Sequence, residues 1–97
     1  MGIDLLDIRF RLEKRFNIAL IREQFDVDLW ELAHRRQPPD FTAGEIYELL
    51  LQELKRQNRD VPENSWGLFC FCVSEALGLD AREIQPDSLM EADLGMS

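Results

Sequence analysis

The chain has 97 residues, of which 45% are hydrophobic and 31% are charged, so it is long enough for one domain with a modest core. No run of 18 apolar residues occurs, and the first residues lack the pattern of a secretory signal, so we expect a cytoplasmic protein that does not span a membrane. The net charge of −8 repels phosphate groups and therefore argues against nucleic acid or anionic lipid as a partner.

The negative charge is concentrated in the second part of the chain. Residues 1–36 carry seven acidic and seven basic side chains, whereas the remaining residues carry twelve acidic and four basic ones. Two interpretations remain open for this acidic part. It suits docking on a basic patch of a protein partner, or it simply keeps the protein in solution.

Residues 3–16 are expected to form a helix with two apolar strips. The first strip has the spacing of one helical face and consists of Leu5, Ile8, Leu12 and Phe16. The second strip is rotated well away from the first and consists of Ile3, Leu6 and Phe10. Two interpretations remain open for the second strip: it lies in the core of a bundle, or it faces a partner or a cargo.

The next part of the chain predicts a connector followed by a helix. Residues 17–23 are interpreted as a connector rather than a strand, because no partner strand is predicted elsewhere, and Ile18 and Leu20 should pack on the core. A helix is expected over about residues 24–36. It must end before Pro38 and Pro39, because the residue that precedes a proline avoids the helical conformation.

The clearest helix start is at Thr42, which forms a capping box with Glu45. This helix should run to about residue 57, with a buried stripe that consists of Ile46, Leu49, Leu50 and Leu54. Residues 55–60 are all polar and indicate a helix end, so residues 58–64 are expected to form a linker.

A further helix is predicted over residues 65–77, capped by Asn64 or Ser65 and ended by Gly78. Its apolar residues lie on all sides, so it should be the most buried helix, with Phe69, Val73 and Leu77 inside. A short turn and an irregular acidic tail should follow. We therefore predict an all-α bundle of three main helices and one or two short ones, in a single domain that spans residues 1–97.

The sequence predicts no catalytic or metal site. Cys70 and Cys72 are two residues apart on a helix and point in different directions, so they should be buried free thiols. His34 is the one histidine, and it cannot form a metal-ligand cluster at the usual spacings. The protein is therefore not expected to be an enzyme.

Several segments resemble parts of the acyl carrier protein family. Residues 2–16 resemble the family's second helix, D-S-L-D-x-V-E-L-V-x-x-L-E-E-x-F, with these positions in register: Asp4, Asp7, Ile8, Leu12, Glu13 and Phe16. Residues 42–47 resemble the T-V-G-D start of the family's last helix. Residues 75–89 and 91–95 resemble the end of its first helix and the loop into its D-L-G-x-D-S motif.

The order of these segments is that of a circularly permuted carrier. Residues 1–57 resemble carrier helices two to four, residues 58–64 form a linker, and residues 65–97 resemble helix one and its following loop. The resemblance implies an acyl-carrier-like bundle that docks on acyl-transferring enzymes of the fatty-acid or polyketide type. The alternative is a helical protein-interaction or regulatory module that keeps the fold without a cargo.

The chain departs from the family at the residue that carries the phosphopantetheine group. The modified serine aligns with Gly2, which has no hydroxyl, and Ser97 is the one hydroxyl that would lie close by. The resemblance therefore implies Ser97 as the attachment residue if the group is present, although we expect an unmodified carrier fold. The second departure is charge, because four basic residues occupy a helix that is usually acidic: Arg9, Arg11, Lys14 and Arg15.

Overall fold

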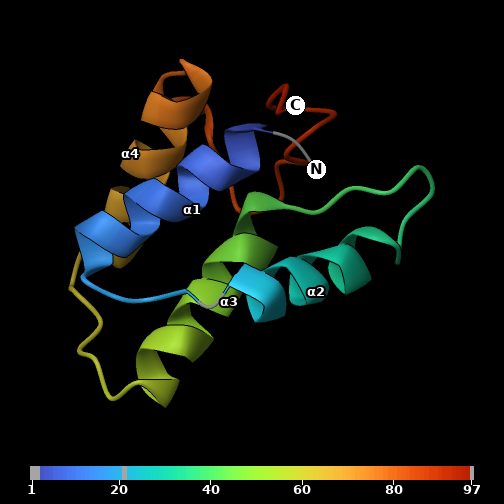
Figure 1. Ribbon diagram of the computed structural model, residues 1–97. Coiled ribbons are helices and arrows are strands. Elements are labelled where there is room, and N and C mark those ends of the chain that lie inside the picture. Colours follow the sequence, from blue (N-terminus) through green and yellow to red (C-terminus); the bar gives the residue numbers. More distant parts are fainter. Residues whose placement is uncertain (1–2, 21, 97) are drawn as a thin grey trace.

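Four α-helices and one short 3₁₀ helix make up the computed structural model, which describes residues 3–20 and 22–96 (Figure 1). The elements are α1 (Ile3–Phe16), α2 (Arg22–Ala33), α3 (Ala43–Arg56), α4 (Ser65–Leu77) and the 3₁₀ helix η1 (Ala81–Glu83). Within these residues the β-structure is limited to one isolated bridge between Thr42 and Leu89. The all-α class is confirmed, and the expected three main helices are corrected to four of similar length.

Helix α1 packs against α4 in an antiparallel orientation (Figure 1). Arg15, near the end of α1, lies over the ring of Phe71. Arg11, one turn earlier in α1, instead reaches Glu75, one turn later in α4. The predicted bounds of α1 and its first apolar strip are confirmed, because the buried residues of the helix are Leu5, Ile8, Leu12 and Phe16.

Helix α4 is buried on one side rather than all round. It contributes six buried residues, against four each from α1 and α3, and Phe69 and Val73 are completely inaccessible to solvent. The expectation for Leu77 was too strong, since this residue is half-buried, and Phe71 is 43% exposed. An apolar composition on every face thus does not require burial on every face, because only one side of α4 meets the rest of the bundle.

The two ends of α4 differ in how well they were predicted. Gly78 ends the helix with a φ of 70°, which confirms the left-handed stop expected of glycine. At the start, Asn64 occupies the cap position but makes no side-chain cap hydrogen bond. Ser65 does not cap either, because its hydroxyl is hydrogen-bonded to the Tyr47 hydroxyl of α3.

Helix α2 begins at Arg22 and ends at Ala33, earlier than the expected end at residue 36. The backbone N–H groups of Arg35 and Arg36 bond three residues back, which tightens the last turn into a non-helical bend. The Ala33 carbonyl also accepts a hydrogen bond of 3.1 Å from the Asp40 N–H. Before the helix, the connector is confirmed in its role, because Ile18 and Leu20 are both buried.

Helix α3 begins with the predicted capping box. The Thr42 side chain accepts a hydrogen bond from the Glu45 N–H, and the Glu45 carboxylate accepts one from the Thr42 N–H at 2.8 Å. Arg36 also donates to this carboxylate at 2.7 Å. Burial tends to raise the pKa of Glu45, but the Thr42 and Arg36 donors outweigh it and hold the pKa below its usual value.

The predicted apolar stripe of α3 is confirmed except at Leu49. Ile46, Leu50 and Leu54 are buried, whereas Leu49 is half-buried.

The segment that follows η1 is a bound part of the fold rather than an irregular tail. Its buried apolar residues are Ile84, Met90, Leu94 and Met96. Three backbone hydrogen bonds of 2.9 Å join it to the start of α3, and they run from Ala43 to Ser88, from Gly44 to Pro86 and from Met90 to Phe41. A Cβ atom at Gly44 would lie 2.7 Å from the Pro86 carbonyl oxygen, so this close approach requires glycine.

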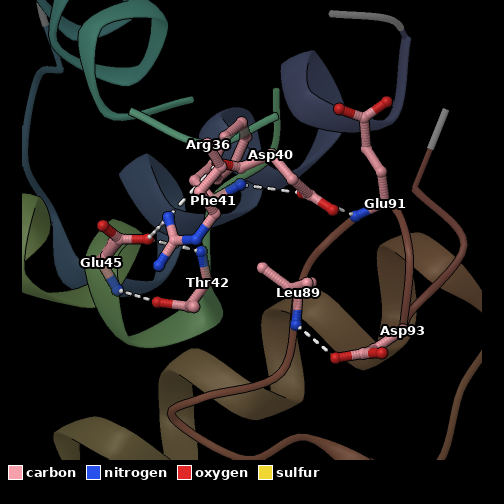
Figure 2. Close-up of polar contacts among 8 residues, drawn as sticks. All are labelled: Arg36, Asp40, Phe41, Thr42, Glu45, Leu89, Glu91 and Asp93. Carbon is pink, nitrogen blue, oxygen red and sulfur yellow. Dashed lines mark hydrogen bonds and ion pairs between the residues drawn. The ribbon is translucent and has the colours of Figure 1, made fainter. Parts of the chain in front are cut away.

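The carboxylate of Asp40 completes this attachment (Figure 2). Asp40 is 5% exposed, and its two oxygens accept hydrogen bonds from the N–H groups of Phe41 at 2.8 Å, Glu91 at 3.1 Å and Ala92 at 3.0 Å. We call this set of contacts the Asp40 clasp. Since Glu91 and Ala92 are remote in sequence, the clasp fixes the C-terminal segment to the segment between α2 and α3.

The first turn of α1 and the last described residues lie at the same end of the molecule (Figure 1). This placement follows from the antiparallel packing of α1 on α4 and from the return of the C-terminal segment along the start of α3. In the described part of the chain, no helix has the length and apolar character needed to cross a membrane.

Candidate functional site

The second apolar strip of α1 lies on the surface. The side chains of Ile3, Leu6 and Phe10 are 82%, 46% and 55% exposed, on a face of α1 that does not meet the bundle. This exposure excludes the interpretation that the strip belongs to the core of this chain. That the strip faces a partner remains a prediction, and it makes α1 the candidate docking helix.

Ion pairs along α1 hold most of its charged side chains beside the strip. Arg9 pairs with Glu13 at 3.2 Å and Arg11 pairs with Asp7 at 2.9 Å, both across one helical turn. Glu13 also accepts a hydrogen bond of 3.0 Å from the Leu20 N–H, which ties the connector back to the helix. Such partly exposed pairs add little to stability, so their main effect is to orient the side chains.

An open groove of about 360 Å³ lies between α1 and α4. It is lined by Arg11, Lys14, Arg15, Cys72 and Glu75. The Lys14 amino group lies 5.0 Å from the centre of the Phe10 ring, and the Arg15 guanidinium lies 5.4 Å from the centre of the Phe71 ring. The groove therefore lies between Phe10, the last residue of the apolar strip, and the exposed ring of Phe71 in α4.

This basic groove was missed by the sequence analysis. The four basic residues of α1 were recognised, but the residues of α4 that complete the groove belong to the helix that was expected to be the most buried. The two sides are about 60 residues apart in the chain, so no local spacing pattern predicts their contact.

The two cysteines are buried free thiols, as predicted. Burial raises the pKa of Cys70 to about 11, and burial also raises the pKa of Cys72, partly offset by the nearby Arg15 guanidinium. The Cys72 thiol is directed toward the Arg11 carbonyl oxygen at 3.8 Å. Thiols held protonated in this way are poor nucleophiles, so neither cysteine is a candidate for covalent chemistry.

The described residues contain no group of three or more His, Cys, Asp or Glu side chains that could hold a metal ion. His34 lies at the surface beyond the end of α2, where its ring stacks on Trp30 at 4.1 Å. Its Nδ1 atom is 2.8 Å from the Trp30 carbonyl oxygen. These contacts are those of a surface residue at a helix end.

The predicted attachment residue Ser97 and the aligned Gly2 lie outside the described residues. Of the residues just before Ser97, Met96 is buried and its N–H bonds to the Met90 carbonyl oxygen at 2.9 Å. The other serine of this segment, Ser88, uses its hydroxyl to accept a hydrogen bond from the Gln85 N–H at 3.0 Å. Ser88 therefore has a role in the local turn.

Comparisons of the chain with protein-family models, with curated proteins and with solved structures find no match. They identify no family, and the architecture is that of a small four-helix protein.

Proposed function

We propose that this protein is an acyl-carrier-like docking protein that presents α1 to an acyl-transferring enzyme and carries no prosthetic group. The observation that carries the proposal is the exposed strip of Ile3, Leu6 and Phe10. It lies on the helix whose sequence resembles the second helix of carriers. Contiguous apolar side chains at the surface are typical of sites where proteins meet.

The packing of α1 and α4 supports a permuted carrier arrangement. In a permuted carrier, the helix at residues 65–77 takes the place of carrier helix one, and the helix at residues 3–16 takes the place of carrier helix two. The two helices should then be neighbours, and the segment before Ser97 should lead back to the start of α1. The antiparallel packing of α1 on α4, and the position of the first turn of α1 near the last described residues, support this arrangement (Figure 1). The capping box at Thr42 and Glu45 also occurs where the resemblance expects the start of the last helix.

The described residues do not form a cradle for a phosphopantetheine phosphate. In the described segment that leads to Ser97, the charged side chains are those of Asp87, Glu91 and Asp93, all of which repel a phosphate. Met96 is buried and offers no polar side-chain atom. We therefore derive no step through this group and assign the protein a docking role alone.

Two measurements test the proposal. Incubation with coenzyme A and a broad-specificity phosphopantetheinyl transferase should leave the intact mass unchanged. A mass increase that disappears in Ser97→Ala would overturn the unmodified state and assign Ser97 as the attachment site.

Docking is tested by biolayer interferometry against a panel of purified acyltransferases and ketosynthases. Leu6→Glu should abolish binding, because it places a charge in the middle of the apolar strip. The matched control is Val61→Glu, since Val61 is 49% exposed, close to the 46% of Leu6, but lies in the linker between α3 and α4. Failure of the native protein to bind any enzyme of the panel, or equal losses in the two variants, would refute the docking role.

A second candidate function is a helical interaction module unrelated to acyl transfer. Val27 and Trp30 favour it, because they are 51% and 56% exposed on α2, away from the candidate docking helix. If partners of this protein are lost on Trp30→Ala and kept on Leu6→Glu, then α2 is the docking helix and the second candidate replaces the first.

A further inference from the structure

Among the described residues, two cations in the groove between α1 and α4 form no ion pair with a carboxylate. Arg9 is paired with Glu13, and Arg11 is shared between Asp7 at 2.9 Å and Glu75 at 3.5 Å. Lys14 and Arg15 form no ion pair with any carboxylate of the described residues. Both are exposed, and both line the groove.

The local charge of the groove is therefore opposite to the net charge of the chain. The protein carries a net charge of −8, but charges separated by more than about 8 Å are largely screened at physiological ionic strength. Glu75 is the one carboxylate among the described residues that line the groove, and it is engaged by Arg11. A ligand that enters the groove thus meets a positive surface on an acidic protein.

Exposed aromatic rings flank these cations. Lys14 lies over Phe10, which is 55% exposed, and Arg15 lies over Phe71, which is 43% exposed. Each positive charge therefore lies beside exposed apolar surface. A partner segment that contacts both the cations and the rings needs carboxylates to pair with the two cations. It also needs apolar side chains one helical turn away to pack on the rings.

We propose that this groove receives an acidic amphipathic helix of a partner protein, whose carboxylates pair with Lys14 and Arg15 and whose apolar residues pack on Phe10 and Phe71. This inference rests on the proposed function, because both take α1 as the docking helix. It adds the chemistry of the partner segment that α1 receives. An anionic membrane or a nucleic acid fits less well, because either would bring a large negative surface against the acidic remainder of the protein. A single helix reaches the groove without that repulsion.

The test uses fluorescence anisotropy with two labelled peptides of the same length. One has leucine and glutamate at helical spacing, and the other has lysine in place of each glutamate. The glutamate peptide should bind the full chain with an affinity that falls as salt is added, and the lysine peptide should not bind. Equal binding of the two peptides, no binding of either, or binding of anionic vesicles in place of the glutamate peptide would overturn the proposal.

The charge requirement is tested by the double variant Lys14→Glu with Arg15→Glu. It should weaken binding of the glutamate peptide by about tenfold or more, because two attractions become repulsions. The matched control is Lys55→Glu with Arg59→Glu, which makes the same change in net charge near the end of another helix. Equal weakening by the two double variants would show that net charge, rather than the groove, decides binding.

The milder variant Lys14→Gln with Arg15→Gln removes the charges without reversing them, and circular dichroism checks its fold. It should also weaken the binding of the glutamate peptide, and unchanged binding would refute the proposed pairing. The same variant separates this inference from the proposed function. If acyl-transferring enzymes still bind and still require Leu6, the docking role stands and the acidic partner segment is refuted.

Discussion

The substitution Asp40→Ala removes the side chain that joins the C-terminal segment to the rest of the fold. The carboxylate accepts three backbone hydrogen bonds, two of which come from Glu91 and Ala92 across more than 50 residues of sequence. Asp40 itself is 5% exposed, so water does not replace the lost acceptor without rearrangement. We expect a clear loss of stability rather than a neutral surface effect.

The size of the loss follows from the number and kind of these bonds. A hydrogen bond to a charged group contributes about 1.5–3 kcal/mol to stability. The bond to the adjacent Phe41 is local, and the two remote N–H groups belong to exposed residues that water can partly solvate. The expected cost of Asp40→Ala is therefore about 2–4 kcal/mol of the free energy of unfolding, a large part of what a small domain has.

Urea titration followed by circular dichroism measures this cost. The control is Asp87→Ala, because Asp87 is an exposed aspartate of the same C-terminal segment and makes no hydrogen bond or ion pair with the described residues. Hydrogen exchange adds a local measurement, since the amides of Glu91 and Ala92 should lose protection in Asp40→Ala before the rest of the protein does. A cost below about 0.5 kcal/mol, or one equal to that of Asp87→Ala, would refute the reasoning.

Three further predictions follow from burial and charge. Phe16→Ala should cost about 3–5 kcal/mol because the ring is 7% exposed, whereas Phe10→Ala should cost under about 1 kcal/mol, and equal losses in urea would show that the second strip is packed as core. The folded pKa of Glu45 is lowered, so its carboxylate stabilises the fold above the unfolded value of 4.5 and loses this effect as the pH falls through the folded pKa. Glu45→Gln should then be more destabilising at about pH 7 than at about pH 3, and a cost independent of pH would contradict the capping role. Cys70 and Cys72 should react slowly with a disulfide reagent at about pH 8 in the native state and quickly in urea, while rapid native reaction would show that they are accessible.

The parts of the fold that the sequence predicted correctly depend on signals within a few residues. The capping box at Thr42 and the left-handed stop at Gly78 each involve side chains or backbone groups less than two turns apart. The buried strip of α1 is likewise visible as a helical spacing. These features were predicted because the physical cause and the sequence pattern lie in the same short segment.

The parts that were missed depend on contacts between remote segments. The Asp40 clasp joins residues that no spacing rule connects, so the C-terminal segment was expected to be irregular. The basic groove exists because Arg15 meets Phe71 of another helix, and the exposure of Phe71 depends on which side of α4 is covered. Similarly, the early end of α2 at Ala33 is set in part by a bond from Asp40. For the strip of Ile3, Leu6 and Phe10, the sequence left open whether these residues lie in the core or at the surface. An apolar helical face has the same spacing whether or not another element covers it.

The antiparallel pairing of α1 with α4 also has a consequence for the order of folding during synthesis. Helix α1 is made first, but the helix that covers its buried strip is completed about 60 residues later. At a synthesis rate of about 5–20 residues per second, α1 waits for several seconds with both of its apolar strips uncovered. During this interval the side chains of Leu5, Ile8 and Leu12 are open to association with other nascent chains or to a chaperone that binds apolar segments. The buried strip of α1 therefore acquires its cover only after α4 has been made.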